Sequence, residues 1–328
     1  MKIIVDAMGG DNAPLEIIKG VAMAVEEYDQ QAVLVGDENI IKKLAEENSI
    51  SLKDIEIVHA DSVITMEDSP GCVLKEKNDS SMAAGLKMLA RGEGDAFMSA
   101  GNSGAVVVGA SLIVKRLKPV KRPAFAPVLP KDEGFFMLID SGANVDCRPE
   151  MLLQFAHMGS VYMSEVMGVK NPRIGLANIG TEDHKGGQLQ HEAFAMLKES
   201  GLNFIGNIEA RDIPFDACDV VVCDGFTGNI ILKMYEGVAL AVMKKFKAML
   251  TKNVKTKLAA AMMLKDIVEL KRAMDYNEFG GAPLLGCAKP VFKVHGSAKA
   301  KTVKNAFRLT MQFAECGAVE KMGNSMKE

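Results

Sequence analysis

The chain has 328 residues, of which 48% are apolar and 25% charged, and its formal net charge is −3 with a pI near 6.0. This composition predicts a globular protein with a large core, built as one large unit or two lobes, and it excludes a disordered chain. A nucleic-acid-binding protein normally carries a basic excess, so no nucleic-acid partner is expected.

Three other features bear on location. Residues 96–114 form the longest uncharged stretch, but their serine, glycine and asparagine favour a strand, a turn and a buried helix over a membrane span. The N-terminal residues reach Asp6 too early for the apolar core of a signal peptide. The six cysteines are scattered without C-x-x-C spacing, which fits buried thiols in a reducing compartment. We therefore expect a cytoplasmic protein without a transmembrane segment.

Short runs rich in valine and isoleucine alternate along the chain with segments of helical period. Strands are predicted at Lys2–Asp6, Ala32–Gly36, Ile55–His59, Ala96–Ser99, Phe135–Asp140, Arg173–Asn178, Asn203–Ile208 and Asp219–Cys223. Helices are predicted at Pro14–Tyr28, Ile40–Glu47, Ser80–Arg91, Gly104–Arg116, Glu150–Met167, Gln188–Glu199 and Gly228–Leu250. The alternation predicts an α/β fold of three layers, α/β/α, with a largely parallel sheet. Residues 1–328 are expected to form a single catalytic domain, with residues 119–130 as the candidate lobe boundary or exposed connection.

Five predicted strands end in a turn built from glycine with aspartate or asparagine. These turns are residues 6–12, 99–104, 140–144, 178–187 and 223–229. Ligands of open α/β sheets bind beyond the carboxyl ends of the strands, where glycine lets backbone N–H groups approach an anion. A single such loop is more often an ordinary turn with an N-cap. Five of them at one sheet edge predict a cleft for an oxyanion such as phosphate.

Familiar motifs for other chemistries are missing from the sequence. It has no G-x-G-x-x-G after a strand, no Walker A sequence and no G-x-S-x-G elbow. The five histidines lack the spacing of metal ligands. Neither a metal nor a cofactor is expected.

Several blocks together resemble the bacterial phosphate acyltransferase family, PlsX. They are Val5–Asp11 with Pro14, Ser99–Ala105, Asp140–Asn144, Asp219–Asn229 and Gly280–Gly286. The resemblance runs in family order to at least His295-Gly296-Ser297, which covers nearly the whole chain. Ser103 stands where the family is expected to favour threonine, a change that keeps the hydroxyl group.

The resemblance implies transfer of a long-chain fatty acyl group from acyl carrier protein to inorganic phosphate. The product, an acyl phosphate, would serve a glycerol-3-phosphate acyltransferase in the synthesis of phosphatidic acid and phospholipids. The resemblance also implies a fold related to phosphotransacetylase and isocitrate dehydrogenase, a homodimer, no metal or cofactor, and peripheral association with the membrane.

Phosphate is already a nucleophile, so the enzyme has to hold it beside the thioester and stabilise the oxyanion that forms. We expect Lys185 to make the largest electrostatic contribution and Asn229 to donate a hydrogen bond to the phosphate or the oxyanion. The residues expected to bind phosphate and thioester are Gly9, Gly10, Asn102, Ser103, Gly104, Asn144, Thr227 and Gly228. Asp6, Asp140 and Asp224 are expected to orient loops, because carboxylates repel phosphate.

A basic segment lies between Lys244 and Arg272, with nine basic and two acidic residues, so nine minus two gives a local charge of +7. It contains an apolar run, residues 258–264. The segment from about 240 to 275 is predicted to be a basic helical excursion from the body. The residues expected to touch a membrane surface or the acidic carrier protein are Lys257, Leu258, Met262 and Lys265. Packing of the run on the body or across a dimer interface is the alternative.

Three other functions stay open at this point. One is a phosphotransacetylase that acts on a short acyl-coenzyme A. Another is a nicotinamide-dependent dehydrogenase of the same fold, which the missing dinucleotide motif disfavours. The last is a non-catalytic scaffold that binds acyl phosphate at the membrane.

Overall fold

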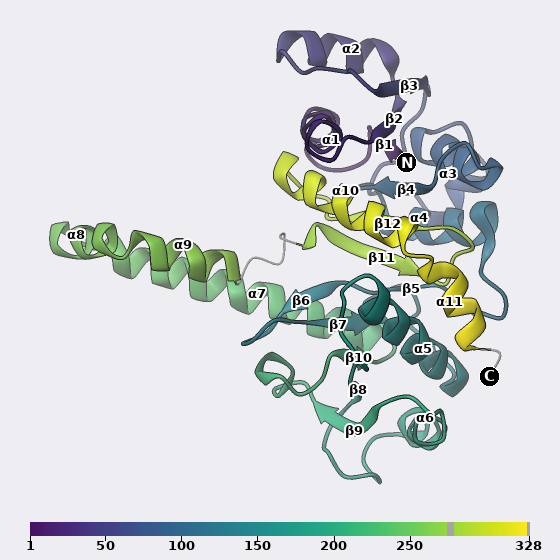
Figure 1. Cartoon of the computed structure of the whole chain (residues 1–328), viewed down its shortest axis with the longest axis vertical. Helices are drawn as coiled ribbons and strands as arrows, with labels where there is room; N and C mark the ends of the chain where they lie inside the picture. Colours follow the sequence, from purple (N-terminus) through teal and green to yellow (C-terminus); the bar gives the residue numbers. More distant parts are fainter. Residues whose placement is uncertain (274–278, 327–328) are drawn as a thin grey trace.

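The protein is built around two β-sheets in the computed structural model, which describes residues 1–273 and 279–326 (Figure 1). The larger sheet has the strand order β3-β2-β1-β4-β12-β11-β5, and the smaller has the order β6-β7-β10-β8-β9. The strands are β1 Lys2–Asp6, β2 Gln31–Gly36, β3 Ile55–His59, β4 Ala96–Ser99, β5 Ala124–Phe125, β6 Val128–Pro130, β7 Phe135–Ile139, β8 Ile174–Asn178, β9 Phe204–Glu209, β10 Val220–Val222, β11 Gly281–Leu285 and β12 Val291–Val294.

Helices follow most strands and cover both faces of the two sheets (Figure 1). They are α1 Leu15–Tyr28, α2 Glu38–Glu47, α3 Ser81–Arg91, α4 Ser103–Gly109, α5 Pro149–Glu165, α6 Gln188–Lys198, α7 Gly225–Leu250, α8 Val254–Met262, α9 Leu264–Ala273, α10 Ala300–Glu315 and α11 Ala318–Ser325. A π-helical stretch, Ala110–Lys115, continues α4. Every strand and helix predicted from the sequence is present, with ends displaced by three residues or fewer.

Burial of both faces explains why inner strands such as β1 and β2 are continuous apolar runs. In β1, Ile3 and Val5 pack in the core that also holds buried residues of α1 and α10, while Ile4 points to the other face, toward α3. Most neighbouring strands are parallel; the antiparallel exceptions are β11, which pairs with β12 and β5, and β6, which pairs with β7. The predicted α/β class with largely parallel sheets in an α/β/α arrangement is confirmed.

The expectation that the five glycine-containing loops share one sheet edge is wrong. The loops after β1 and β4 belong to the larger sheet, whereas those after β7, β8 and β10 belong to the smaller one. The chain leaves the larger sheet at β5 and enters the smaller one at β6, separated by Ala126 and Pro127. This crossing lies inside the segment 119–130. Alternation of strands and helices says nothing of which strands pair, so a division into two sheets was not foreseen.

Helix α7 is long enough to belong both to the body and to a projecting arm. Its 26 residues extend for about 39 Å. Ile231, Leu232 and Tyr235 pack on the smaller sheet. The later turns run outward beside α8 and α9, and together these form the arm (Figure 1). The arm corresponds to the predicted excursion at 240–275, of which residues 274 and 275 lie outside the described residues.

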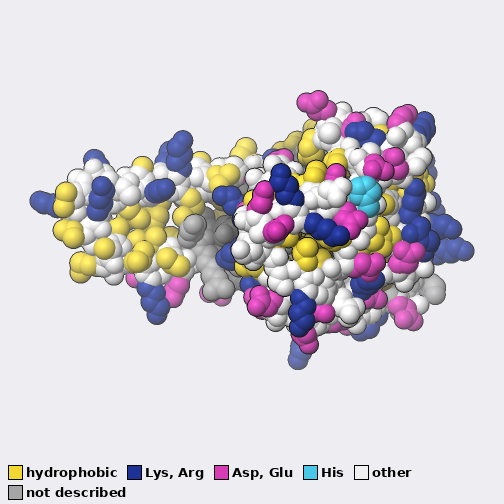
Figure 2. Space-filling model, turned by 90° about the horizontal axis from the view of Figure 1, so that it is seen from above, with side chains coloured by type: hydrophobic (Ala, Val, Ile, Leu, Met, Phe, Trp, Pro, Cys, Tyr) yellow, Lys and Arg dark blue, Asp and Glu magenta, His cyan; other side chains and the backbone are white. Residues whose placement is uncertain are grey.

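The apolar run of the arm is exposed. Leu258 is 63% exposed and Met262 is 89% exposed, so this run is not packed on the body. Figure 2 shows hydrophobic side chains gathered at the end of the arm, with Lys and Arg side chains beside them. Among the described residues, no helix combines the length and the apolar character that crossing a membrane requires.

Two glycines of α7 provide a test of how this helix is held. A Cβ atom at Gly228 would lie 1.9 Å from the carbonyl oxygen of Asp140, whereas one at Gly237 would meet no atom within 4 Å. We expect Gly228→Ala to lower the free energy of unfolding by about 1–3 kcal/mol or more through overpacking. Gly237→Ala should raise it by up to about 1 kcal/mol, because alanine favours the helix. Urea denaturation measures both, and equal effects of the two changes would contradict this view of α7.

Candidate active site

The loop after β1 is organised by a buried carboxylate. Asp6 accepts hydrogen bonds from the hydroxyl groups of Ser81 at 2.7 Å and Ser99 at 2.6 Å, and from the backbone N–H of Met8 at 3.2 Å. Burial raises the pKa of Asp6, while these hydrogen bonds act in the opposite direction. The side chain therefore ties the end of β1 to β4 and α3.

Two aspartates do the same for the smaller sheet. Asp140, fully buried, accepts hydrogen bonds from the backbone N–H groups of Ala143 at 3.1 Å and Asn144 at 2.7 Å. Burial raises the pKa of this carboxyl as well. Asp224 caps α7 by accepting from the N–H and the hydroxyl of Thr227, each at 2.8 Å. As predicted, these aspartates orient loops.

The glycines predicted to bind substrate serve close packing between loops. A Cβ at Gly9 would lie 2.8 Å from Cα of Gly101, and one at Gly104 would lie 2.6 Å from a ring carbon of Pro70. Gly10 has a φ of +115°, which side-chain-bearing residues rarely adopt. Gly228 packs on Asp140, as described above. Contact of these glycines with substrate stays a prediction.

The side chains of Asn102 and Asn144, both predicted for the site, form hydrogen bonds with backbone groups. Asn102 caps α4, accepting from the N–H of Ala105 at 3.1 Å, and its amide donates to the carbonyl oxygen of Asp68 at 3.1 Å. The amide of Asn144 donates to the carbonyl oxygen of Pro123 at 2.8 Å. For Asn102, Asn144 and Thr227, contact with substrate likewise stays a prediction.

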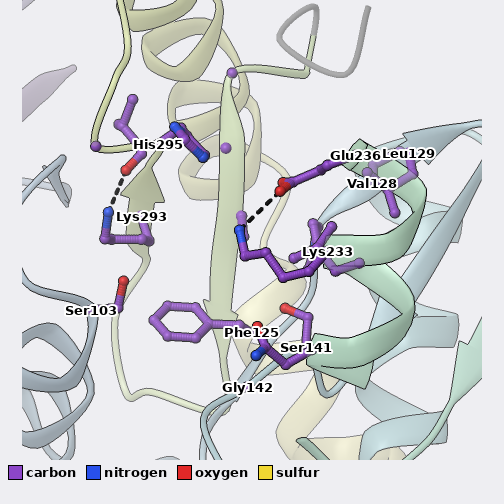
Figure 3. Close-up of a pocket in the computed structure, with 18 of the residues that line it drawn as sticks. Ser103, Phe125, Val128, Leu129, Ser141, Gly142, Lys233, Glu236, Lys293 and His295 are labelled. Atoms are coloured by element: carbon purple, nitrogen blue, oxygen red, sulfur yellow. Dashed lines mark hydrogen bonds and ion pairs between the residues drawn. The ribbon is translucent and has the colours of Figure 1, made fainter. Parts of the chain in front are cut away.

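A cavity of about 370 Å³ opens where residues from both sheets meet (Figure 3). Two residues predicted for the site line it: Ser103, the first residue of α4, and Asn229, in the second turn of α7. Ser141 and Gly142, from the loop after β7, lie on the same side as α7. A Cβ at Gly142 would be 3.6 Å from the side chain of Asn229, so this loop lies against that amide.

Another part of the cavity lining is apolar. Val128 and Leu129 come from β6 and Phe125 from β5 (Figure 3). Leu232 comes from the second turn of α7. The sequence did not point to Phe125, Val128 and Leu129, because β5 and β6 are only two and three residues long. A cavity with hydrogen-bond donors and an apolar wall can take a ligand that has a polar head and a hydrocarbon chain.

Two lysines that the sequence did not single out face the cavity. Lys233 of α7 forms an ion pair with Glu236 at 2.9 Å. Lys293 of β12 is 9% exposed, and its Nζ donates to the carbonyl oxygens of Ala100 at 3.3 Å and Val294. A signal was available, because Lys293 interrupts an apolar run in the sequence.

Burial alters two titratable groups on this side of the cavity. Desolvation lowers the pKa of Lys293 to about 8, although the charges of Asp6 and Asp11 act to raise it. Burial also lowers the pKa of His295, whose Nδ1 lies 2.8 Å from the hydroxyl oxygen of Ser297. A residue with a perturbed pKa in a cavity is a candidate for function.

Lys185 lies in the loop between β8 and α6 and does not line this cavity. Its side chain is 38% exposed, and its Nζ is 3.8 Å from a carboxylate oxygen of Glu182. Its catalytic role stays a prediction. Lys257, Leu258 and Met262 lie in α8, and Lys265 lies in α9, so the predicted contact residues are all on the arm.

Comparison with known proteins shows which family the chain resembles over its length. Residues 1–321 match the model of the FA_synthesis family, described as fatty acid synthesis protein. A protein of Acetivibrio thermocellus named phosphate acyltransferase is 47% identical over 98% of this chain and 95% of its own length. A phosphate acyltransferase of Bacillus licheniformis is 49% identical over 94% of this chain and 93% of its own.

Among solved structures, a phosphotransacetylase of Streptococcus pyogenes is similar, with a TM-score of 0.65 over 96% of this chain and 94% of that one. At 15% identity, this similarity shows a shared fold and no more. The family model and both relatives span nearly the whole chain, the two sheets and the cavity between them included. The chain therefore belongs to the fatty acid synthesis protein family, together with relatives named phosphate acyltransferase.

Proposed function

We propose that this cavity is where the enzyme transfers a fatty acyl group from a thioester to inorganic phosphate. The proposal rests on one observation: the same cavity is lined by hydrogen-bond donors and by apolar side chains. Ser103 and Asn229 supply hydrogen-bond donors, and Val128, Leu129 and Leu232 supply an apolar wall. The relatives named phosphate acyltransferase support the same reaction.

Phosphate and thioester have to be held together for this reaction, and the negative charge that develops on the carbonyl oxygen has to be stabilised. The amide of Asn229, next to the Gly142 loop, is the donor for the phosphate or the oxyanion. Ser103 donates its hydroxyl to the phosphate from the other side. Lys185 remains the further cation, which we expect from the sequence to make the largest electrostatic contribution.

We assign the acyl donor as acyl carrier protein and the consumer of the product as a glycerol-3-phosphate acyltransferase that uses acyl phosphate. The same proposal places the protein in the cytoplasm as a homodimer that associates peripherally with the membrane. The exposed apolar run and the lysines of the arm support a surface contact of this kind. A phosphotransacetylase acting on short acyl-coenzyme A is not favoured, because the similar phosphotransacetylase shares only 15% identity.

The reaction is tested by mixing the protein with palmitoyl-(acyl carrier protein), with and without phosphate. Release of the carrier thiol and of hydroxylamine-trappable acyl phosphate should both depend on phosphate. Palmitoyl-coenzyme A and acetyl-coenzyme A serve as competing donors. Thiol release without acyl phosphate would indicate a thioesterase, and no turnover in either direction would favour the scaffold.

Replacing Asn229 should affect the chemical step. Asn229→Ala removes one donor from the cavity, and such a loss typically lowers kcat by about 10²–10³. The KM for the acyl donor should change little, because the apolar wall is intact. Steady-state kinetics measure both constants, with Lys185→Ala in parallel. Near-normal turnover of either variant would remove that residue from the mechanism.

Replacing Leu232 should affect acyl binding. This side chain is partly buried in the apolar wall, so Leu232→Ser removes apolar contact area from the acyl chain. We expect the KM for a palmitoyl donor to rise by about tenfold, within the free energy of burying a leucine. A butyryl donor and phosphate, which do not reach this wall, act as internal controls. An equal rise for all three substrates would contradict an acyl site at Leu232.

Contact of the arm with membranes can be tested without disturbing the core. Leu258→Glu with Met262→Glu introduces two charges at exposed positions, and we expect binding to vesicles of anionic phospholipid to be lost. Leu112→Glu is the matched control, because Leu112 is 61% exposed and lies on the body. Vesicle flotation measures the effect. Binding that survives the double change in a folded protein would exclude the arm as the contact.

A further inference from the structure

Lys293 occupies an unusual place for a charged residue. Strand β12 lies inside the larger sheet, between β4 and β11, and the other three residues of this strand are at most 1% exposed. Lys293 is paired in register with Ser99 of β4 and Ala282 of β11. It extends toward the cavity on the same side as Ser103, as Figure 3 shows.

The charge of Lys293 lacks a close counterion among the described residues. Two backbone carbonyls take two of its three hydrogens, and no described carboxylate lies within 4 Å. Asp6 and Asp11 act on it only from farther away. Lys233, the other lysine of the cavity, is by contrast paired with Glu236. A buried ammonium group without a counterion is unfavourable, and an anion bound in the cavity would compensate its charge.

The substrates differ in whether they can provide this anion. A thioester has no charge, and its hydrocarbon chain suits the apolar wall. Phosphate is a mixture of the monoanion and the dianion near neutral pH and is mainly the dianion above it, and its oxygens accept several hydrogen bonds. An ammonium group is a compact charge with three donors, which suits a phosphate that must approach a carbonyl carbon from a fixed direction.

We propose that the ammonium group of Lys293 binds the phosphate substrate and holds it beside the acyl thioester. This inference rests on the proposed function and adds the cation that binds the nucleophile. An oxygen of the hydrogen phosphate dianion attacks the carbonyl carbon, so a C–O bond forms and the C–S bond breaks. Sulfur leaves with the electron pair and receives the proton that the phosphate carried. Both sides of the reaction then have the same atoms and the same charge.

The stability of a variant and its response to phosphate should change in opposite ways. Lys293→Met keeps an unbranched side chain, one atom shorter, but removes the buried charge, so its Tm in phosphate-free buffer should equal or exceed that of the wild type. Phosphate should raise the Tm of the wild type and not that of Lys293→Met, because ligands stabilise only proteins that bind them. Sodium chloride at equal ionic strength controls for salt.

A lysine outside the cavity provides the matched control. Lys304 of α10 forms an ion pair with Glu27 at 2.6 Å, and its side chain is 18% exposed. Lys304→Met should therefore lower the Tm slightly and keep the response to phosphate. A purely structural role for Lys293 predicts the same pattern for Lys293→Met, and that pattern would overturn the proposal.

Turnover separates this inference from the proposed function. In Lys293→Met, the KM for phosphate should rise by about 10- to 100-fold, the usual range for a lost hydrogen bond to a charged group, while the KM for the acyl donor stays within about twofold. If the wild type showed no turnover, the proposed function itself would be contradicted. If the wild type turned over and Lys293→Met had an unchanged KM for phosphate, only the role of Lys293 in phosphate binding would be contradicted.

The wild type provides a second test that does not depend on the variant folding. With a pKa of about 8, the charged fraction of Lys293 falls from about 90% at pH 7 to about 10% at pH 9, so the affinity for the hydrogen phosphate dianion should fall by about tenfold. Asp6 and Asp11 favour the charged form, and Lys233 disfavours it. The pKa of His295 is lowered, so this group stays neutral throughout. A constant affinity for the dianion between pH 7 and pH 9 would overturn the proposal.

Discussion

The close approach of α7 to the loop after β7 is the contact on which the cavity depends. The carbonyl oxygen of Asp140 fills the space that a side chain at position 228 would need, and the carboxylate of Asp140 holds the rest of its loop through backbone N–H groups. Asn229, the next residue of α7, thereby lies against Gly142 in the cavity. Three residues further along α7, Leu232 adds to the apolar wall. A single packing contact thus positions a hydrogen-bond donor and a hydrophobic residue together.

The same helix also joins the cavity to the arm. Because α7 is continuous from Gly225 to Leu250, the residues that line the cavity and those that carry α8 and α9 belong to one element. An enzyme that takes a long acyl chain benefits from a surface contact that is fixed relative to its active site. The arm is fixed in this way without a hinge within α7. Its exposed apolar and basic side chains are those expected of a surface that lies on a membrane or binds an acidic partner.

Much of the fold could be predicted from the sequence, because strands buried on both faces are plain apolar runs and the helices between them are amphipathic. Strands β5 and β6 are too short to show a pattern, and Lys293 and Pro283 interrupt the runs that form β12 and β11. The division of the strands between two sheets depends on pairing, which periodicity does not encode. The five loops were located correctly because each follows an apolar run. Their sheet edge was not predicted correctly because these runs do not show which strands pair.

The candidate site was predictable only in part. Glycine in a loop suggests, from the sequence, that an anion can approach the backbone. At Gly9, Gly104 and Gly228, however, neighbouring protein atoms occupy the space that a side chain would need. Ser103 and Asn229, which line the cavity, were singled out from the sequence because they follow strand ends. Lys293 was not singled out, because it lies within a strand. Its position in the cavity depends on the packing of the smaller sheet and α7 against the larger sheet.

The central claim is that one cavity holds the phosphate and the acyl chain together. The most direct measurement is a crystal structure with phosphate and a non-reactive thioether analogue of the palmitoyl donor. We predict phosphate within about 3 Å of the Lys293 ammonium and the Ser103 hydroxyl, with the alkyl chain along Val128 and Leu232. Phosphate bound beside Lys185, with the cavity between the two sheets empty, would contradict the claim.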